Sequence, residues 1–230
     1  MNKTKKSIIP NVEELSRQLK RLRSIQQDFR FPPEMSTNDA YCLLYTSLRI
    51  EVERTGHKLK TTDSATNAVS AMAHYLTLRG RSVKTGFLLC GTPGNGKTSL
   101  LYALQSAIEW MRHAGLFSTA YGQYDMDNLQ IVSAKTLVAE SGKAGLIEQY
   151  KRKPLLGIDD MGNEPGEILS YGNALTPLVD VIEARYNARL FTVITTNLTG
   201  QQIREKYGAR IADRLNEMMC IVVYKDDTFR

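Results

Sequence analysis

The amino-acid sequence predicts an α/β fold in which a parallel sheet is covered by helices on both faces. From residue 86 onward, short apolar runs alternate with stretches of helical periodicity, a pattern typical of strands buried on both faces. The first run leads into the glycine-rich segment CGTPGNGKTSL at residues 90–100, and a second apolar run follows directly. A glycine-rich loop between a strand and a helix is common in such sheets, so both observations indicate the same fold class.

A basic, amphipathic helix is expected near the start of the chain. Asn11 precedes Glu14 by three residues, which is the spacing of a helix N-cap and its reciprocal partner. Apolar residues then recur at helical spacing, with arginine and lysine between them, at Val12, Leu15, Leu19, Leu22 and Ile25. The apolar stripe either packs on its own domain or binds a partner or nucleic acid. Pro32 and Pro33 end the pattern and are typical of a hinge, which slightly favours the second interpretation.

Two further helices precede the alternating region. They are expected over 37–55 and 64–79, because each stretch begins at a hydroxyl residue and ends near a glycine. The expected strands cover 86–90, 129–132, 155–158, 190–195 and 220–224. The expected helices between and after them cover 97–112, 134–140, 174–188, 201–207 and 209–217.

The segment from Gly91 to Thr98 satisfies the pattern GxxxxGK[ST] in full, which predicts a binding loop for a nucleoside triphosphate. Glycines allow backbone angles that other residues avoid, so successive N–H groups can surround phosphate oxygens, and the following helix adds its positive end. Lys97 is expected to contact the β and γ phosphates, and the Thr98 hydroxyl to bind Mg²⁺. The candidate binding residues are Gly91, Thr92, Pro93, Gly94, Asn95, Gly96, Lys97, Thr98 and Ser99.

Two carboxylates end the apolar run at residues 155–158. Ligands of parallel sheets lie at the carboxyl ends of strands, so Asp159 is expected beside the phosphate loop, where it would hold Mg²⁺. Asp160 occupies the next position, where many hydrolytic motors carry a glutamate that orients the attacking water. Glu164 is a second candidate for polarising water or for contacting a neighbouring subunit. The alternative is a strand end with solvated acids.

Polar residues late in the chain suggest roles beyond nucleotide binding. Asn197 follows a β-branched run and is expected to hydrogen-bond the γ-phosphate or its attacking water, or else to cap the turn. Arg210 and Arg214 are four residues apart, so they share one face of a short helix. From that face one of them could reach the γ-phosphate bound by a neighbouring subunit. The alternative is a solvated ion-pair face near Asp213.

Composition excludes several other classes of protein. Three dispersed cysteines and three histidines without metal-ligand spacing argue against a disulfide framework or a zinc site. The first ten residues lack an apolar signal segment, and no later run approaches the roughly 20 apolar residues that cross a bilayer, so we expect a cytoplasmic protein. The net charge is +6, and residues 1–30 hold eight Lys or Arg against three acids. This excess indicates either an acidic partner such as nucleic acid or a solvated tail.

The ordered set GTPGNGKT, LLGIDDMGNE, TVITTN, YGARIADRL and YKDDTFR resembles the AAA+ ATPases of the DnaC/DnaI helicase-loader and IstB transposition-helper group. The resemblance covers roughly residues 60–230. It implies a P-loop NTPase fold of the AAA+ type with a five-stranded parallel sheet flanked by helices, preceded by a short helical N-terminal extension. It also implies that the strand bearing Asn197 lies between the strands that lead to the phosphate loop and to Asp159.

The same resemblance assigns roles to matching residues. Lys97 and Thr98 look like the Walker A motif, Asp159 and Asp160 like Walker B, Asn197 like sensor 1, and Arg214 like the arginine finger with Arg210 as its companion. Arg230 falls where a sensor 2 arginine is found. On this basis the chain divides into a basic N-terminal arm at 1–33, a helical segment at 34–80 and an AAA+ ATP-binding core at 81–230. The sequence departs from many relatives in having no N-terminal cysteine cluster and no separate lid after the core.

The resemblance implies an ATP-dependent DNA replication factor, a DnaC-like helicase loader that binds ATP, Mg²⁺ and single-stranded DNA. It would assemble head to tail through the ATP site, with a replicative DNA helicase as partner and no membrane association. An IstB-like transposition helper, with a transposase as partner, is the alternative. A P-loop small-molecule kinase and a non-hydrolysing nucleotide-gated adaptor are further alternatives.

Overall fold

The computed structural model describes residues 11–16, 29–60, 62–79, 82–117, 128–165, 168–170 and 173–224. Its centre is a five-stranded parallel sheet in the order β2-β3-β6-β1-β7. The strands are β1 (Gly86–Gly91), β2 (Gln130–Ser133), β3 (Leu155–Met161), β6 (Phe191–Thr196) and β7 (Met219–Tyr224). All five expected strands are present, and β6 lies between β1 and β3 as expected. The predicted fold class is confirmed.

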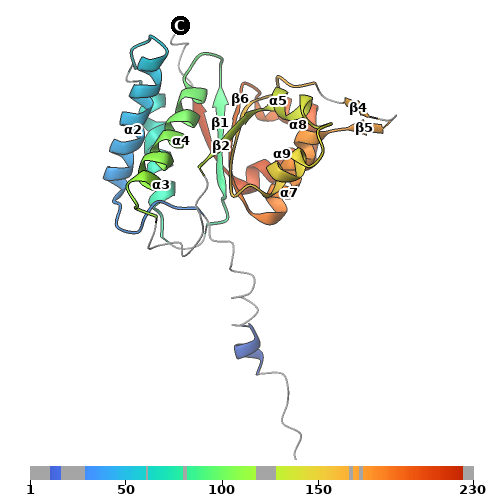
Figure 1. The fold of residues 1–230 in the computed structure, drawn as a ribbon, viewed down its shortest axis with the longest axis horizontal. Coiled ribbons are helices and arrows are strands. Elements are labelled where there is room, and N and C mark those ends of the chain that lie inside the picture. The colour runs from blue at the N-terminus through green and yellow to red at the C-terminus, as the bar shows by residue number, and fades with distance from the viewer. Residues whose placement is uncertain are drawn as a thin grey trace, which may run out of the picture.

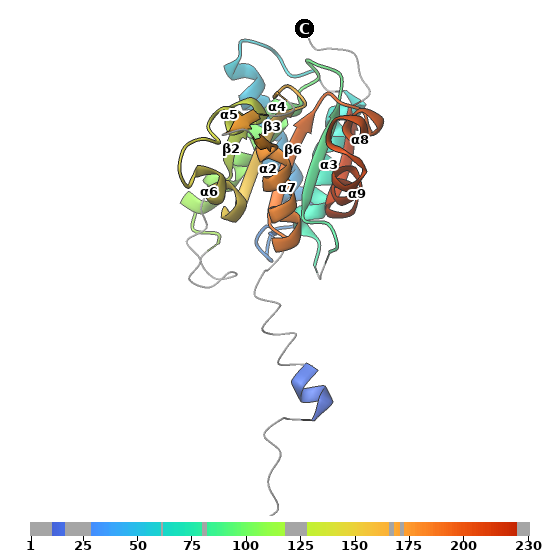
Figure 2. The same cartoon turned by 90° about the vertical axis from the view of Figure 1, so that its right-hand side faces the viewer.

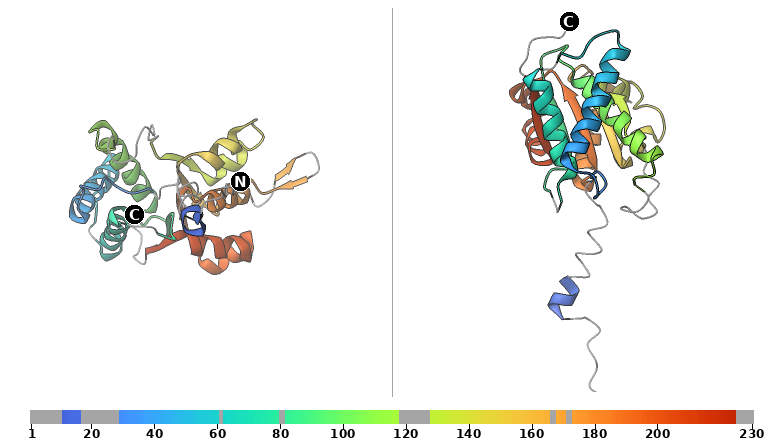
Figure 3. Two further views of the ribbon diagram at one scale, coloured as in Figure 1. Left: turned by 90° about the horizontal axis from the view of Figure 1, so that it is seen from below. Right: turned by 90° about the vertical axis from the view of Figure 1, so that its left-hand side faces the viewer.

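Helices cover both faces of this sheet in two groups (Figure 1, Figure 3). One face carries α2 (Thr37–Arg54), α3 (Asp63–Thr77) and α4 (Lys97–His113). The other carries α5 (Ala134–Ala139), α6 (Leu146–Arg152), α7 (Pro177–Ala188), α8 (Gly200–Tyr207) and α9 (Ala209–Met218). Strand β1 shows why both layers form, because Phe87 and Leu89 belong to the first apolar cluster and Leu88 to the second.

Two helices begin at capping boxes. Ser36 caps α2, where its hydroxyl accepts from the Asp39 N–H at 3.1 Å and the Asp39 carboxylate accepts from the Ser36 N–H at 3.2 Å. Thr199 and Gln202 make the same exchange at the start of α8. At the start of the chain, Asn11 accepts from the Glu14 N–H at 2.8 Å, as the spacing predicts. The remainder of the expected basic helix, residues 17–28, lies outside the described part of the chain.

The segment that leads into α2 is part of the core. Phe29 is buried with its ring centroid 4.8 Å from that of Phe191, at the amino end of β6. The Phe31 N–H donates to the Leu76 carbonyl at 2.7 Å. The Arg79 guanidinium donates to the Pro32 carbonyl at 3.2 Å. The proline pair is therefore fixed to the body of the protein, and the interpretation of it as a hinge is wrong.

Two features of the second layer were not expected from the sequence. Helix α6 precedes β3, and a small antiparallel hairpin follows β3. The hairpin consists of β4 (Ile168–Ser170) and β5 (Asn173–Leu175). The hairpin extends away from the sheet (Figure 1). Helix α7 consequently begins at Pro177 rather than at residue 174, since proline is favoured in a first helical turn. Figure 2 shows α7 and the α8–α9 pair over the sheet. Within the described ranges, no helix is both long enough and apolar enough to cross a bilayer.

Candidate nucleotide-binding site

A cleft of about 740 Å³ lies where β1, β3 and β6 end. Its volume falls in the range of small-molecule sites. The lining from the phosphate loop and the strand ends is Pro93, Gly94, Asn95, Gly96, Lys97, Thr98, Ser99, Asp159, Asp160, Asn163, Asn197 and Tyr224. The remaining lining comes from α2, α3 and the segment between them, with Leu48, Val52, Thr55, His57, Lys58, Leu59, Lys60 and Ala65. The helical segment that precedes the sheet thus contributes one side of the cleft.

The phosphate loop requires its glycines. Gly91 has φ +148, and a Cβ there would lie 2.5 Å from the Tyr224 carbonyl oxygen, because β7 runs directly beside it. Gly96 has φ +90 and is the N-cap of α4, so no side chain occupies the amino end of that helix. The N–H groups of the first helical turn carry the positive end of the helix dipole, which suits a phosphate group.

The ammonium group of Lys97 is held inside this loop. Its Nζ donates to the carbonyls of Gly91 and Thr92 at 2.8 and 2.7 Å and to Asn95 Oδ1 at 3.0 Å. Burial lowers the pKa of Lys97, and the charge of Asp160 acts in the opposite direction. The loop therefore presents a partly desolvated cation beside the cleft, where electrostatic attraction to a phosphate is stronger than in bulk water.

Asp159 receives two hydroxyl donors. Thr98 Oγ1 donates to Asp159 Oδ1 at 2.9 Å, and Thr195 Oγ1 donates to the same oxygen at 2.6 Å. Thr98 and Asp159 thus lie side by side as the sequence predicts, and their hydroxyl and carboxylate oxygens are the hard ligands that Mg²⁺ prefers. Thr195 was not anticipated, although its position two residues before Asn197 in TVITTN could have signalled it. Among the described residues no group of three or more His, Cys, Asp or Glu forms an alternative metal site.

Asp160 is held in a left-handed backbone conformation with φ +55. The register of β3 against β6 shifts between Ile158 and Met161, and the Asp160 N–H donates to Thr195 Oγ1 at 2.8 Å. Burial, with the neighbouring Asp159 charge as the next cause, raises the pKa of Asp160. The irregularity sets both carboxylates beside the cleft, because consecutive residues of a regular strand would point to opposite faces.

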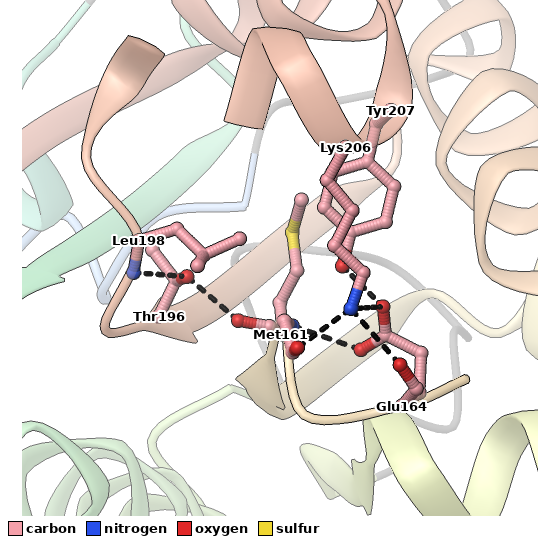
Figure 4. A network of polar contacts seen from close by, with 7 residues as sticks. Met161, Glu164, Thr196, Leu198, Lys206 and Tyr207 are labelled. Atoms are coloured by element: carbon pink, nitrogen blue, oxygen red, sulfur yellow. Dashed lines mark hydrogen bonds and ion pairs between the residues drawn. The ribbon is translucent and has the colours of Figure 1, made fainter. Parts of the chain in front are cut away.

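Asn197 lines the cleft directly after β6. The preceding residue fixes β6 to β3, since Thr196 Oγ1 donates to the Met161 carbonyl at 2.7 Å and accepts from the Leu198 N–H at 3.1 Å (Figure 4). Asn197 therefore follows a firmly connected strand end beside the two aspartates. This placement is compatible with a contact to a terminal phosphate.

Glu164 does not line the cleft. Its side chain is buried and accepts from the Gly162 N–H at 2.8 Å and from the Tyr207 hydroxyl (Figure 4). Lys206 Nζ lies 3.2 Å from Glu164 Oε1 and donates to the carbonyls of Gly162 and Glu164 at 2.6 and 2.9 Å. Burial, together with the hydrogen bond to Glu164, raises the pKa of Tyr207 well above its usual range. This carboxylate thus connects the turn after β3 to the end of α8.

The two late arginines lie outside the cleft, on α9. Arg214 is 15% exposed, its Nη1 is 2.6 Å from Glu183 Oε1, and its guanidinium carbon lies 5.0 Å from the centre of the Tyr186 ring. Arg210 is 70% exposed, with its Nε 3.0 Å from the same Glu183 oxygen. The structure thus brings both arginines to one carboxylate of α7, away from the chain's own phosphate loop. Arg230 lies outside the described residues.

Solved structures of other proteins share this fold. The chain is similar to the DnaC helicase loader, with 22% identity, 73% of this chain and 93% of that chain covered, and a TM-score of 0.53. It is similar to DnaI with 19% identity, coverage of 78% and 93%, and a TM-score of 0.53. A protein from Streptococcus pyogenes described as a primosome component gives 17% identity, coverage of 90% and 98%, and a TM-score of 0.56. The sequence matches no family model and no curated protein. The chain therefore has the AAA+ P-loop NTPase fold found in the DnaC and DnaI helicase loaders.

Proposed function

We propose that the chain is an ATP-dependent DNA replication factor that acts as a helicase loader. The observation that carries this proposal is that the residues matching the AAA+ motifs lie in two separate places. Lys97, Thr98, Asp159, Asp160 and Asn197 line one cleft, whereas the arginines lie on α9 outside it. Besides the loop lysine and Mg²⁺, such ATP sites use an arginine that stabilises charge at the γ-phosphate, and this arginine can come from a second subunit.

The geometry supports a specific role for each residue in the cleft. The phosphates would bind over the loop and the amino end of α4, where Lys97 exchanges its loop carbonyls for phosphate oxygens. Thr98 and Asp159 would hold Mg²⁺, which neutralises charge on the phosphates when bound. Asp160 would orient the attacking water, and Asn197 would hydrogen-bond the γ-phosphate or that water. Thr195 holds Asp159 and the Asp160 backbone in register.

Assembly follows from the position of α9. Because its arginines lie outside their own cleft, we propose that subunits associate head to tail, and such a heterologous contact builds an open helix or a ring. Arg210 is the more exposed of the two, and Arg214 is held by Glu183 and Tyr186. We assign Arg214 as the arginine finger and Arg210 as its companion, with Glu183 as the carboxylate from which both are released.

Partners are proposed from charge and from fold. The excess of Lys and Arg in residues 1–30 would attract single-stranded DNA or an acidic protein surface, and the solved structures named above include a helicase loader. A replicative DNA helicase is therefore the proposed protein partner. A transposase, as in a transposition helper, would use the same ATP site.

The arginines provide the test of this function. Arg210→Ala and Arg214→Ala, separately and together, are expected to keep ATP affinity within about threefold. The double variant should lose at least tenfold of the hydrolysis that rises with protein concentration and single-stranded DNA, in line with the value of an arginine finger. Arg152→Ala, at an exposed position on α6, is the control. Full hydrolysis by the double variant would contradict a shared site.

A second substitution separates a hydrolysing enzyme from a nucleotide-gated adaptor. Asp160→Asn keeps the side-chain shape, and asparagine tolerates the left-handed conformation at φ +55, so the fold should be preserved. We expect ATP binding to remain, because Lys97 and Asp159 are intact, and turnover to fall by at least tenfold because the group that orients water loses its charge. Phosphate release under single-turnover conditions measures this. Equal rates for both proteins would exclude Asp160 from the reaction.

A further inference from the structure

The turn that follows β3 is bound to the end of α8 by polar contacts. Two consecutive residues at the end of α8, Lys206 and Tyr207, make hydrogen bonds and an ion pair to the Gly162–Glu164 turn. We call Glu164, Lys206 and Tyr207 the α8 clamp. The Glu164 side chain is 1% exposed, so its negative charge is balanced by the Lys206 ammonium group, and the Tyr207 hydroxyl adds a hydrogen bond to the carboxylate.

The turn has little freedom to move independently of the clamp. Gly162 has φ +115, and a Cβ at that position would lie 2.8 Å from the Leu198 side chain. The Asn163 N–H donates to the Asp160 carbonyl at 3.2 Å, and Asn163 itself lines the cleft. The backbone that carries Asp160 thus continues within four residues into the clamp.

On its other side the clamp meets the arginine helix. Tyr207 ends α8, Gly208 with φ +86 forms the corner, and α9 begins at Ala209. Arg204 on α8 donates to Asp213 on α9 at 2.6 Å, so the two helices are connected by an ion pair in addition to their packing. Only two residues separate Tyr207 from Arg210.

We propose that the α8 clamp positions the arginines that one subunit presents to the ATP site of its neighbour, with Glu164 as the positioning residue. The inference rests on the head-to-tail function proposed above. A carboxylate buried in the turn after β3 fixes the end of α8, and through the corner at Gly208 it fixes the start of α9. Glu164 acts from outside the cleft, because it is not among the residues that line it. It gives the residue a role distinct from polarising water in its own cleft.

A mixing experiment tests the proposal, because it separates the two sides of the shared site. A Lys97→Ala subunit supplies arginines but no ATP site, and an Arg210→Ala, Arg214→Ala subunit supplies an ATP site but no arginines. The mixture should hydrolyse ATP where each protein alone does not. Glu164→Gln is then added to one partner at a time, with Tyr207→Phe as a milder variant that keeps the ring and removes the hydroxyl. Glu148→Gln, an exposed residue on α6, is the matched control.

We expect Glu164→Gln in the arginine-supplying subunit to lower kcat of the mixture at least tenfold with KM for ATP unchanged, and Tyr207→Phe to lower it about threefold. The same changes in the ATP-supplying subunit should have a clearly smaller effect. A rate within twofold of the Glu148→Gln control would overturn the inference. A loss confined to the ATP-supplying subunit, or equal in both subunits, would also overturn it. No hydrolysis from the mixture with Glu164 intact would overturn the head-to-tail site itself, and the inference with it.

Discussion

Lys97→Ala is expected to weaken ATP binding at least 100-fold. The ammonium group is the one cation among the loop residues 91–99, and it is partly desolvated beside the place where phosphates would bind. Charge-assisted hydrogen bonds of this kind are worth about twice a neutral one, and loss of two or three accounts for about 3 kcal/mol. Isothermal titration with ATP and Mg²⁺ measures the change.

The fold should survive this substitution. The oxygens that Lys97 contacts belong to a loop that borders the cleft, so water can replace the ammonium group there. Thermal unfolding of the variant should therefore match that of Lys143→Ala, a control in which the lysine side chain is 67% exposed. ATP affinity within threefold of the unmodified protein would show that the loop does not bind a triphosphate in the proposed manner.

Arg185→Met is expected to destabilise the protein strongly. Arg185 is fully buried on α7, and its guanidinium donates to the carbonyls of Tyr150, Lys153 and Phe191 at 2.8, 2.6 and 2.7 Å and to Thr192 Oγ1 at 2.9 Å. Burial lowers the pKa of Arg185 to about 9, so the group remains charged at neutral pH. One side chain thus joins the end of α6, the start of β3 and the start of β6.

Methionine would remove the donor that Arg185 supplies to each of those three carbonyls. Loss of a buried partner costs about 1–3 kcal/mol for each group, so a total of at least about 3 kcal/mol is expected, a large part of the stability of an ordinary domain. Arg185→Lys should recover little of the lost stability. A single ammonium nitrogen cannot reach acceptors that lie in as many directions as the planar guanidinium does. Urea unfolding gives the free energies, with Arg152→Met, whose arginine side chain is 84% exposed, as control. A loss below about 1 kcal/mol for Arg185→Met would contradict this account.

The sequence predicts those parts of the molecule that depend on local pattern. The strand, loop and helix around Gly91 to Ser99 are contiguous, and the apolar run before Asp159 marks a buried strand. Both follow from periodicity and from the chemistry of glycine. The hairpin of β4 and β5 was not predicted, because each strand has three residues and a periodic signal needs at least about four.

The remaining site features depend on partners distant in sequence. Glu164 stands in the polar turn MGNEP, which is typical of a solvated acid, and its partners Lys206 and Tyr207 follow more than forty residues later. Arg185 lies in a helix of mixed polarity, where arginine is normally at the surface. Thr195 contacts Asp159 because β3 and β6 pair in parallel with Ile158 opposite Ile194, which brings together two residues 36 positions apart in the sequence. The burial of Glu164 and Arg185 and the contact of Thr195 depend on tertiary packing, which cannot be read from the neighbouring residues in the sequence.

The packing of Phe29 against Phe191 determines where a partner bound to the N-terminal residues would lie relative to the cleft. Strand β6 has six residues, which corresponds to about 20 Å, and Asn197 follows its far end at the cleft. Phe29 therefore packs at the end of β6 opposite the cleft. A partner bound to the residues before Phe29 would lie at that end of the sheet. It would leave the cleft open for ATP to bind and for phosphate to leave.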